Sequence, residues 1–457
     1  MSHVIAAVST GASVSAIGII RLSGDGCIAV ADKVFTLNSG KSLGESPYRR
    51  LVLGTLHDKQ RRVIDQCMAV VSRAPHSYTG EDTVEFHCHG SPAVLAAGLE
   101  ALYLAGALPA KRGEFTKRAF LNGKMDLTQA EAVIDVINAK NEYALQSSVS
   151  QLRGSVSKEI HEIRDRILYE IAFIESALDD PEHISLDGYG EKLLGVVLSV
   201  KKKLEKLIRS SSNGRVVSEG VKTVILGKPN AGKSSLMNVL VGEDRAIVTD
   251  VAGTTRDILE EHIYLQGISL NVVDTAGIRD TEDVVEKIGV SRAMEEAKKA
   301  DLIIYVVDGS RKLDENDYQI MDFIKERKSV VLLNKSDLEP VVSAKEVEER
   351  SGHKVIGISA KEETGIDLLE EEIKALFYEG EIDFNDQVMI TNVRHVRALK
   401  DAFDSMSMVE KSIENGMPED FYSIDLMDAY EKLGLIVGES VEDDLVNEIF
   451  SKFCMGK

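Results

Sequence analysis

The chain has 457 residues, enough for two or three domains, and 44% of them are hydrophobic, which excludes a disordered protein. Its formal net charge of -21 disfavours binding of nucleic acid by bulk attraction, so any RNA contact must use a local basic patch. No stretch approaches the ~20 apolar residues of a membrane span, and the N-terminus lacks the basic region of a signal peptide. The four cysteines are dispersed, with no CxxC, as is typical of a reducing compartment. We therefore expect a cytoplasmic protein.

Residues 1–118 are rich in glycine and contain short β-branched runs, at Val4–Val8, Ala16–Leu22 and Val63–Val71, with one helical stretch at Ala93–Ala105. This pattern predicts a compact α+β domain. The run His87-Cys88-His89 contains metal-ligand residue types. Because alternate residues of a strand share a face, both histidines should point away from Cys88, which argues against a metal site made of these three.

Residues 119–214 predict long amphipathic helices. Thr128 and Glu131 have the spacing of a capping box, and isoleucines then recur at helical spacing from Ile160 to Ile174. No catalytic constellation is present in this region, so we interpret it as a structural helical domain.

Residues 215–378 alternate between strands and helices, which is typical of a Ras-like G domain with a mainly parallel, doubly wound sheet. We expect its strands at Val221–Leu226, Leu270–Val273, Leu302–Val307, Val330–Leu333 and Val355–Ile358. Helical patterns return in residues 379–457, as in Val393–Asn415 and Ser440–Phe453. The simplest architecture is a helical domain into which an α/β domain is inserted.

The segment from Gly227 to Ser234 matches the phosphate loop GxxxxGK[ST], between an expected strand and an expected helix. Small residues let backbone N–H groups surround phosphate oxygens, and the following helix presents its positive end. Lys233 should reach the β- and γ-phosphates, and Ser234 should ligate Mg²⁺. The predicted nucleotide contacts here are Asn230, Ala231, Gly232, Lys233, Ser234 and Ser235.

Three further motifs follow in the order expected of a guanine-nucleotide site. Asp274-Thr275-Ala276-Gly277 can approach Mg²⁺ and the γ-phosphate, and Ser359-Ala360-Lys361 can support the base. Asn334-Lys335-Ser336-Asp337 offers a carboxylate that can accept hydrogen bonds from N1–H and the 2-amino group of guanine. Adenine lacks that donor pair, so the sequence favours GTP over ATP.

The means of positioning the attacking water is open. Ras-like enzymes use a glutamine after DxxG, but Ile278 occupies this position. Several carboxylates lie between Asp280 and Glu286, and one of them could take this role. In the preceding switch segment, Thr255 is a second candidate Mg²⁺ ligand and Arg256 a candidate charge stabiliser.

Several segments closely resemble the tRNA modification GTPase family MnmE (TrmE) over essentially the whole chain. They are IGIIRLSG, YTGEDTVEFHCHG, RAFLNGKMDLTQAEA, TDVAGTTRD, VVEKIGVSRA and the C-terminal FCMGK. The resemblance implies a homodimer that acts with the FAD-containing MnmG (GidA) protein. Together they place an aminomethyl or carboxymethylaminomethyl group on carbon-5 of the wobble uridine of certain tRNAs. It further implies that the N-terminal domain binds a tetrahydrofolate derivative (5-formyl- or methylene-tetrahydrofolate), and that K⁺ activates hydrolysis of GTP.

The same resemblance implies roles for individual residues. It implies K⁺ ligation by Asn230, Thr249, Val251 and Thr254, with the threonines also near GTP, and it makes Glu286 the residue that orients the water. It implies folate binding by Arg21, Glu85, Lys124 and Lys457, and a role of Cys454 in tRNA modification. The chain departs from the family pattern at Ser91, in the run His87-Cys88-His89 and, mildly, at Met455.

Two alternative functions remain open from the residues. One is an RNA-binding ribosome-assembly GTPase, although such proteins often carry a small basic domain that is not evident here. The other is a membrane-remodelling GTPase of the dynamin type, suggested by insertion of the G domain into helices, although no convincing membrane-binding stretch is present.

Overall fold

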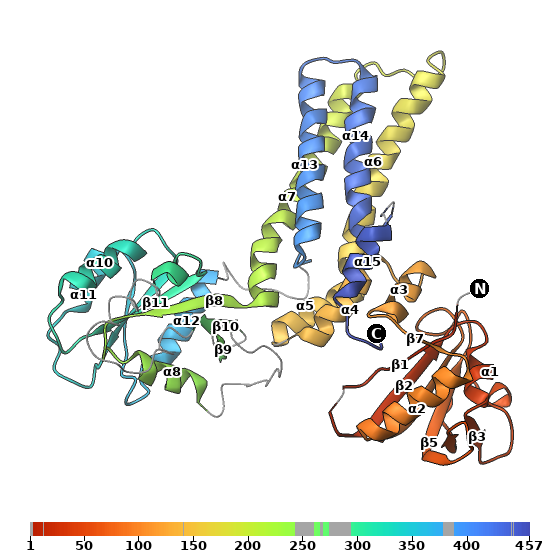
Figure 1. The fold of residues 1–457 in the computed structure, drawn as a ribbon. Helices are drawn as coiled ribbons and strands as arrows, with labels where there is room; N and C mark the ends of the chain where they lie inside the picture. The colour runs from red at the N-terminus through yellow and green to blue at the C-terminus, as the bar shows by residue number, and fades with distance from the viewer. Residues whose placement is uncertain are drawn as a thin grey trace. The chain divides into compact units, whose positions relative to one another are not determined.

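The computed structural model describes residues 3–11, 13–139, 141–242, 260–265, 268–273, 294–377, 388–439, 441 and 443–457. The chain forms two compact units (Figure 1). One comprises Met1–Ile137, Val149–Lys201 and Ala398–Lys457, and the other comprises Asn138–Ser148 and Lys202–Arg397. The segments of the first unit flank those of the second in sequence, as expected for an insertion. The division into the four segments 1–118, 119–214, 215–378 and 379–457 stays a prediction.

The first unit begins with a seven-stranded sheet in the order β3-β4-β5-β6-β2-β1-β7. Its strands are β1 (Ile5–Val8), β2 (Ser15–Ser23), β3 (Phe35–Leu37), β4 (Val52–His57), β5 (Val63–Ser72), β6 (Thr83–Gly90) and β7 (Leu108–Pro109). Neighbouring strands are antiparallel except for β1 and β7. Helices α1 (Cys27–Asp32) and α2 (Pro92–Ala105) bury apolar residues against the sheet, and η1 (Leu43–Glu45) and α3 (Glu114–Leu121) complete this part. The predicted α+β fold is confirmed.

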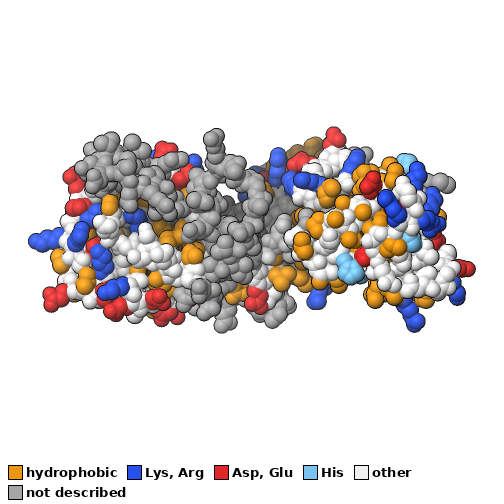
Figure 2. Space-filling view, turned by 60° about the horizontal axis from the view of Figure 1, so that its bottom comes forward, with side chains coloured by type: hydrophobic (Ala, Val, Ile, Leu, Met, Phe, Trp, Pro, Cys, Tyr) orange, Lys and Arg blue, Asp and Glu red, His pale blue; other side chains and the backbone are white. Residues whose placement is uncertain are grey.

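Alternation of side chains makes one face of this sheet the core and leaves the other accessible. On β6, Val84, Phe86 and Cys88 are buried, whereas His89 is exposed. This difference in burial agrees with the expected alternation, while the His89 ring contacts Asp65 through Nδ1 at 2.7 Å. Helix α2 lies close to the sheet at Gly98, where an added Cβ would lie 2.6 Å from Ile20 Cδ1. Figure 2 shows exposed apolar side chains among basic ones on the N-terminal domain, which is at the right of that view.

Seven helices of the described residues follow this domain in sequence, before and after the second sheet: α4 (Leu127–Asn138), α5 (Glu142–Leu152), α6 (Ser155–Asp179), α7 (Tyr189–Glu219), α13 (Val393–Glu414), α14 (Glu419–Val437) and α15 (Asp443–Ser451). In α6 the isoleucines at helical spacing are buried, as the sequence predicts. Helix α6 packs along α14, where the Arg164 guanidinium lies 4.1 Å from the centre of the Tyr430 ring. None of the described helices is both long and apolar enough to cross a membrane.

The predicted capping box at the start of α4 is wrong. The helix begins one residue before Thr128, and Asp126 takes the capping position. The Gln129 N–H donates to Asp126 Oδ1 at 3.0 Å, and the Asp126 N–H donates to Gln129 Oε1 at 3.1 Å. The capping box has the same chemistry as the predicted one, displaced by two residues, because an aspartate competes well with a threonine for this position.

The second unit contains a six-stranded sheet in the order β13-β12-β11-β8-β10-β9. Its strands are β8 (Val221–Leu226), β9 (Glu260–Leu265), β10 (Ile268–Val273), β11 (Leu302–Asp308), β12 (Ser329–Asn334) and β13 (Val355–Gly357). The strands pair in parallel except for β9, which is antiparallel to β10. The described helices between or after these strands are α8 (Lys233–Val241), α10 (Glu315–Ile324), α11 (Ala344–Ser351) and α12 (Ile366–Phe377).

Helices cover both faces of this sheet. One buried cluster joins alternate strand residues such as Ile304 to α8 and α12, and another joins residues such as Tyr305 to α10 and α11. Burial on both faces explains why these strands are continuous apolar runs. The predicted mainly parallel, doubly wound sheet is confirmed. The edge strand β9 was not predicted, because its sequence EEHIYL is half polar.

Candidate nucleotide site

The phosphate loop connects β8 to α8 and needs backbone conformations that few residues adopt. Gly227 and Gly232 have φ of 154° and 102°, and Asn230 has φ of 61°. An added Cβ on Gly232 would lie only 2.0 Å from Asn334 Nδ2. The loop therefore packs directly on the base-recognition motif, and α8 begins at Lys233 with its N-terminal N–H groups beside the loop.

The Lys233 ammonium lies within the loop. Its Nζ donates hydrogen bonds to the carbonyl oxygens of Gly227 at 2.8 Å and Lys228 at 2.9 Å. Burial lowers the pKa of Lys233 from its ordinary value. These contacts place a positive charge where the loop can enclose an anion, as the sequence predicts for phosphate binding.

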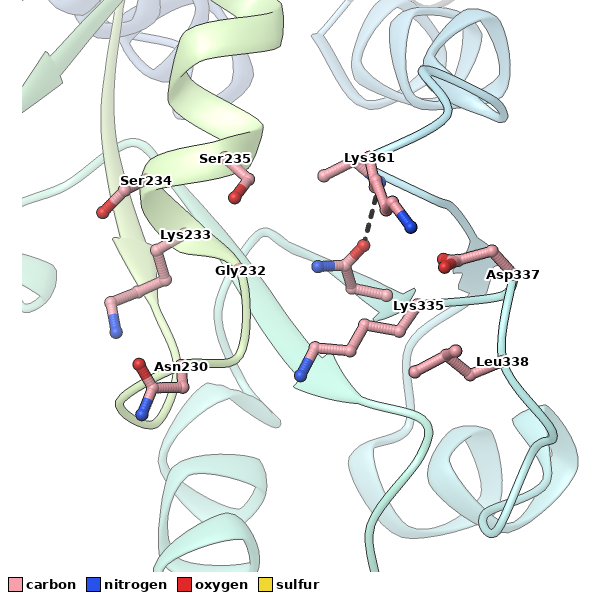
Figure 3. Close-up of a pocket in the computed structure, with 11 residues that line it drawn as sticks. Asn230, Gly232, Lys233, Ser234, Ser235, Lys335, Asp337, Leu338 and Lys361 are labelled. Carbon is pink, nitrogen blue, oxygen red and sulfur yellow. Dashed lines mark hydrogen bonds between the residues drawn. The ribbon is translucent and has the colours of Figure 1, made fainter.

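Asn334 lies at the end of β12 and connects the two sides of the pocket whose lining is drawn in Figure 3. Its Nδ2 donates to the Ala231 carbonyl oxygen at 2.8 Å, and its Oδ1 accepts from the Ala360 N–H at 3.0 Å. Asn334 is only 3% exposed. The asparagine of the NKSD motif thus holds the phosphate loop and the turn around Ala360 together.

Asp337 is placed by Ser359. The Ser359 hydroxyl donates to Asp337 Oδ1 at 2.7 Å, and this hydrogen bond holds the pKa of Asp337 below its ordinary value. The Asp337 side chain is otherwise exposed. An ionised carboxylate with free lone pairs can accept hydrogen bonds from a donor pair on a planar base.

Lys335 lies beside Asp337 and has φ of 67°. Its Nζ donates to Asp308 Oδ2 at 2.6 Å, which extends the lysine stem along the cavity. Burial tends to raise the pKa of Asp308, but hydrogen bonds from Lys335 and Ser310 outweigh it and lower that pKa. The apolar stem and the Leu338 side chain offer surfaces that suit the face of a flat ring.

These residues enclose a cavity of about 480 Å³. Its lining consists of Asn230, Gly232, Lys233, Ser234, Ser235, Asn334, Lys335, Asp337, Leu338, Ala360 and Lys361. All except Leu338 are predicted nucleotide contacts. Sequence reasoning passed over Leu338 because an apolar residue after NKSD carries no chemical signal. Ala231 and Ser359 are tied to this lining by the hydrogen bonds above.

The remaining predicted residues of the nucleotide site lie outside the described part of the chain. They are Thr249, Val251, Thr254, Thr255, Asp274, Thr275, Ala276, Gly277 and Glu286. Their roles stay predictions.

Three of the four predicted folate residues lie together in the first unit. Arg21 on β2 faces Glu85 on β6, and Arg21 Nε lies 2.7 Å from Glu85 Oε1. Burial and the neighbouring Arg21 charge lower the pKa of Lys457. Lys124 Nζ instead donates to the Pro75 carbonyl oxygen at 2.9 Å, and no hydrogen bond or ion pair among the described residues joins it to the other three.

The C-terminal tail packs on the N-terminal domain. The Phe115 N–H donates to the Lys457 carbonyl oxygen at 3.2 Å, and the Ser9 hydroxyl donates to that of Gly456 at 3.0 Å. Gly456 has φ of 86°, and an added Cβ would lie 2.1 Å from Val8 O. The tail fixes Lys457 close to Arg21 and leaves the Cys454 thiol exposed.

Comparisons with known proteins cover the whole chain. The family model "GTP-binding protein TrmE N-terminus" matches residues 4–124, and the family model "MnmE helical domain" matches residues 127–454. The tRNA modification GTPase MnmE of Lachnoclostridium phytofermentans is 53% identical over 99% of both chains. That of Clostridioides difficile is 44% identical over 99% of both.

Solved structures match part of the chain. The G domain of the T. maritima FeoB iron transporter is 25% identical, over 34% of this chain and 98% of that one, with a TM-score of 0.27. A variant of Aquifex aeolicus Era bound to GDP and AlF4⁻ is 28% identical, over 41% of this chain and 67% of that one, also with a TM-score of 0.27. The family assignment depends on the full-length relatives and the two family models: the chain belongs to the tRNA modification GTPase MnmE family.

Proposed function

We propose that the chain binds GTP in the 480 Å³ cavity and hydrolyses it as part of tRNA modification. The observation that carries this proposal is the hydrogen bonding of Asn334 to Ala231, because it places the phosphate loop and the Asp337 carboxylate on one cavity. Lys233 would neutralise phosphate charge, and Asp337 would accept from N1–H and the 2-amino group of guanine. Membership of the MnmE family supports this function and a cytoplasmic location.

Two cations complete the proposed site. The Ser234 hydroxyl, at the N-terminus of α8, lines the cavity and suits Mg²⁺ as an oxygen ligand, with Thr255 as its partner ligand. Asn230 also lines the cavity and offers an amide oxygen for K⁺, with Thr249, Val251 and Thr254 as further ligands. When bound, Mg²⁺ and K⁺ would neutralise the negative charge that develops on the phosphates during hydrolysis. In this scheme Glu286 orients the attacking water, since Ile278 has no hydrogen-bonding group.

The N-terminal domain is proposed to hold a tetrahydrofolate derivative. Glu85 can accept from the aminopyrimidine ring, and the cations of Arg21 and Lys457 suit the carboxylates of the glutamate tail. Lys457 reaches this place because the tail packs on the domain. Lys124 is the weakest member of the set, because its ammonium contacts Pro75.

A homodimer and a flavoprotein partner belong to the same proposal. On the accessible face of the sheet, Leu53 pairs with Met68, and they are 46% and 44% exposed. Exposed apolar pairs of this kind suit a second copy of the chain.

The chemistry on carbon-5 of the wobble uridine requires electron transfer. The proposal assigns this transfer to FAD in the MnmG (GidA) partner, with Cys454 of this chain taking part.

The proposal is tested by the rate of GTP hydrolysis in KCl and in NaCl at matched ionic strength. We expect a large advantage for K⁺ in the full chain and loss of that advantage in Asn230→Ala. Similar rates in both salts would leave a GTPase but contradict the K⁺ site. A second assay measures wobble-uridine modification with the flavoprotein partner and tetrahydrofolate. GTP-dependent sedimentation with ribosomes, without modification, would instead indicate a ribosome-assembly GTPase.

A further inference from the structure

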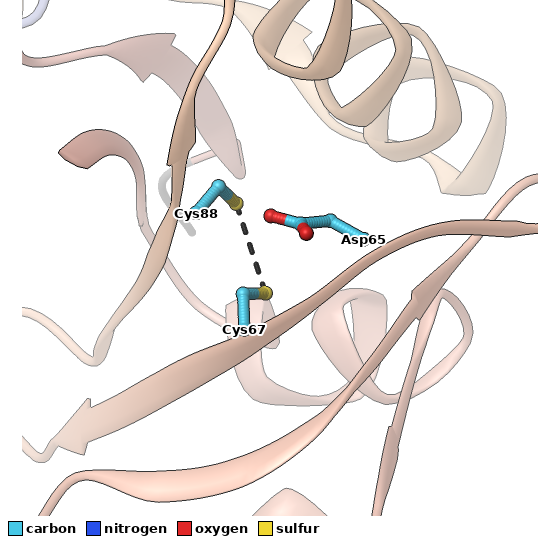
Figure 4. Close-up of side chains that lie close together, drawn as sticks. All are labelled: Asp65, Cys67 and Cys88. Carbon is cyan, nitrogen blue, oxygen red and sulfur yellow. Dashed lines mark hydrogen bonds between the residues drawn. The ribbon is translucent and has the colours of Figure 1, made fainter. Parts of the chain in front are cut away.

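Two buried thiols face each other across strands β5 and β6 of the N-terminal sheet (Figure 4). Met68 pairs with His87, so Cys67 and Cys88 occupy the adjacent cross-strand position. The Cys88 thiol donates to Cys67 Sγ at 3.7 Å, and the two side chains are 2% and 4% exposed. Neither residue has a role in the proposed GTP or folate chemistry.

A carboxylate lies beside the two thiols. Asp65 precedes Cys67 by two residues on β5 and therefore shares its face of the sheet. One ligand atom from each of Asp65, Cys67 and Cys88 lies within 4.8 Å of the others. Asp65 is 9% exposed, and the nearby residues on this face, such as Ala69, are apolar. A buried carboxylate is costly unless it is hydrogen-bonded, and His89 supplies hydrogen bonds to it.

His89 fixes the orientation of this carboxylate. Asp65 Oδ2 accepts from the His89 N–H at 2.9 Å, and Asp65 Oδ1 lies 2.7 Å from His89 Nδ1. The His89 side chain is 74% exposed, so this end of the cluster is open to solvent. Hydrogen bonds of this type orient metal-binding side chains.

The spacing of the two sulfur atoms matches a tetrahedral metal ion. Bonds of ~2.3 Å to zinc at the tetrahedral angle place two thiolate sulfurs about 3.8 Å apart. Cys67 and Cys88 already have a separation of 3.7 Å, so a metal would need little rearrangement of either side chain. A carboxylate oxygen supplies the third ligand, and a water on the open side of Asp65 can supply the fourth.

We propose that Asp65, Cys67 and Cys88 form a binding site for a thiophilic divalent metal ion of the zinc class, with His89 as a positioning residue. Binding replaces two thiol protons, which pass to solvent, and no electron is transferred. The ion would connect β5 to β6 three residues from Glu85, and so would stabilise the strand that carries this proposed folate residue. The inference does not depend on the proposed function, because its ligands lie outside the nucleotide cavity.

The test is titration of the reduced, chelator-treated full chain with Co²⁺, in a Cys454→Ser background that removes the exposed thiol. We expect one tetrahedral cobalt per chain, with charge-transfer bands from two thiolates, and displacement of these bands by Zn²⁺. Cys67→Ser and Cys88→Ser should abolish the bands, and Asp65→Asn should weaken binding about tenfold or more. Cys27→Ser is the matched control, since it removes another buried thiol of the same domain and should leave the spectrum unchanged.

Retention of GTP binding by each variant shows that the G domain is intact, and a circular dichroism spectrum equal to that of the parent shows that the overall secondary structure is retained. Absence of a thiolate–cobalt spectrum, or an unchanged spectrum in Cys67→Ser, would overturn the proposal. Formation of a Cys67–Cys88 disulfide on mild oxidation, in a chain that takes up no metal, would also overturn it and identify a redox pair.

Discussion

The Asn334 side chain donates a 2.8 Å hydrogen bond to the carbonyl oxygen of Ala231. It therefore connects the end of β12 to the phosphate loop, 103 residues earlier in the chain. Its Oδ1 accepts from the Ala360 N–H, so the amide uses one N–H and one oxygen lone pair within the protein and keeps one of each for a ligand. In this site the asparagine of NKSD acts as a support for the nucleotide-binding loops.

Asn334→Ala should therefore weaken binding of both GTP and GDP. The change leaves the Ala231 carbonyl and the Ala360 N–H without their partner, and each buried unpaired group costs about 1–3 kcal/mol. We expect affinity to fall about tenfold or more, as measured by isothermal titration calorimetry. Asn316→Ala, on the exposed side of α10, is the control and should bind normally. Equal affinities in the two variants would contradict the supporting role of Asn334.

Asp337→Asn should change the base that the cavity accepts. In the proposed function the carboxylate accepts from the N1–H and 2-amino group of guanine, whereas an amide would donate to the 2-oxo group of xanthine. We expect roughly a ten- to hundredfold loss of GTP affinity and a gain for xanthosine triphosphate. Competition between the two nucleotides against a fluorescent GDP analogue measures the change. Unaltered preference for GTP would show that Asp337 does not contact the base.

Ser359→Ala should change the pH dependence of GTP binding, because the Ser359 hydroxyl donates a hydrogen bond to the Asp337 carboxylate. This hydrogen bond lowers the pKa of Asp337, so the ionised, accepting form persists as the pH falls below the ordinary carboxyl value. In Ser359→Ala the pKa should rise towards that value, and loss of GTP affinity on acidification should begin at a higher pH. Affinities measured from pH 7 down to the limit of stability test this. Superimposable profiles for the two proteins would contradict it.

The sequence predicted together most of the residues that line the cavity, because the motifs that contain them are local in the chain. Each motif follows a continuous apolar strand, and parallel strands bring their carboxyl ends to one edge, which accounts for the meeting of Lys233, Asn334 and Asp337. It missed features without a local signal. Leu338 has no reactive group. The sequence of β9 is half polar, and the strand is recognised only from its pairing with β10. At the start of α4, Asp126 rather than Thr128 is the capping residue.

The N-terminal domain was predicted less completely, because antiparallel pairing joins residues that are distant in sequence. The resemblance to the family named Arg21 and Glu85, but only the register of β2 and β6 places them opposite each other. The sequence also gave no indication that Asp65 lies beside Cys67 and Cys88, since β6 follows β5 through a turn whose length does not fix the register.

The four cysteines should differ sharply in reactivity. Cys454 is exposed, whereas Cys27, Cys67 and Cys88 are buried. Burial, with the nearby charges of Asp82 and Glu81, raises the pKa of Cys27 to about 12, so its thiolate is absent even at mildly alkaline pH. We expect one fast-reacting thiol in the native chain with a disulfide-exchange reagent, and four after denaturation. A fast thiol that persists in Cys454→Ser would contradict the burial of the other three.

Glu85→Gln should separate the folate function from hydrolysis of GTP. The substitution keeps the size of the side chain and an oxygen that can accept from Arg21 Nε, but it removes the negative charge offered to the aminopyrimidine ring. We expect binding of tetrahydrofolate, measured by fluorescence titration, to fall about tenfold or more, and K⁺-dependent GTP hydrolysis to remain. Glu100→Gln, on the exposed side of α2, is the control. Because the nucleotide cavity is formed entirely by the second unit, a parallel loss of both activities would contradict the assignment of Glu85 to folate and would indicate a general effect on folding.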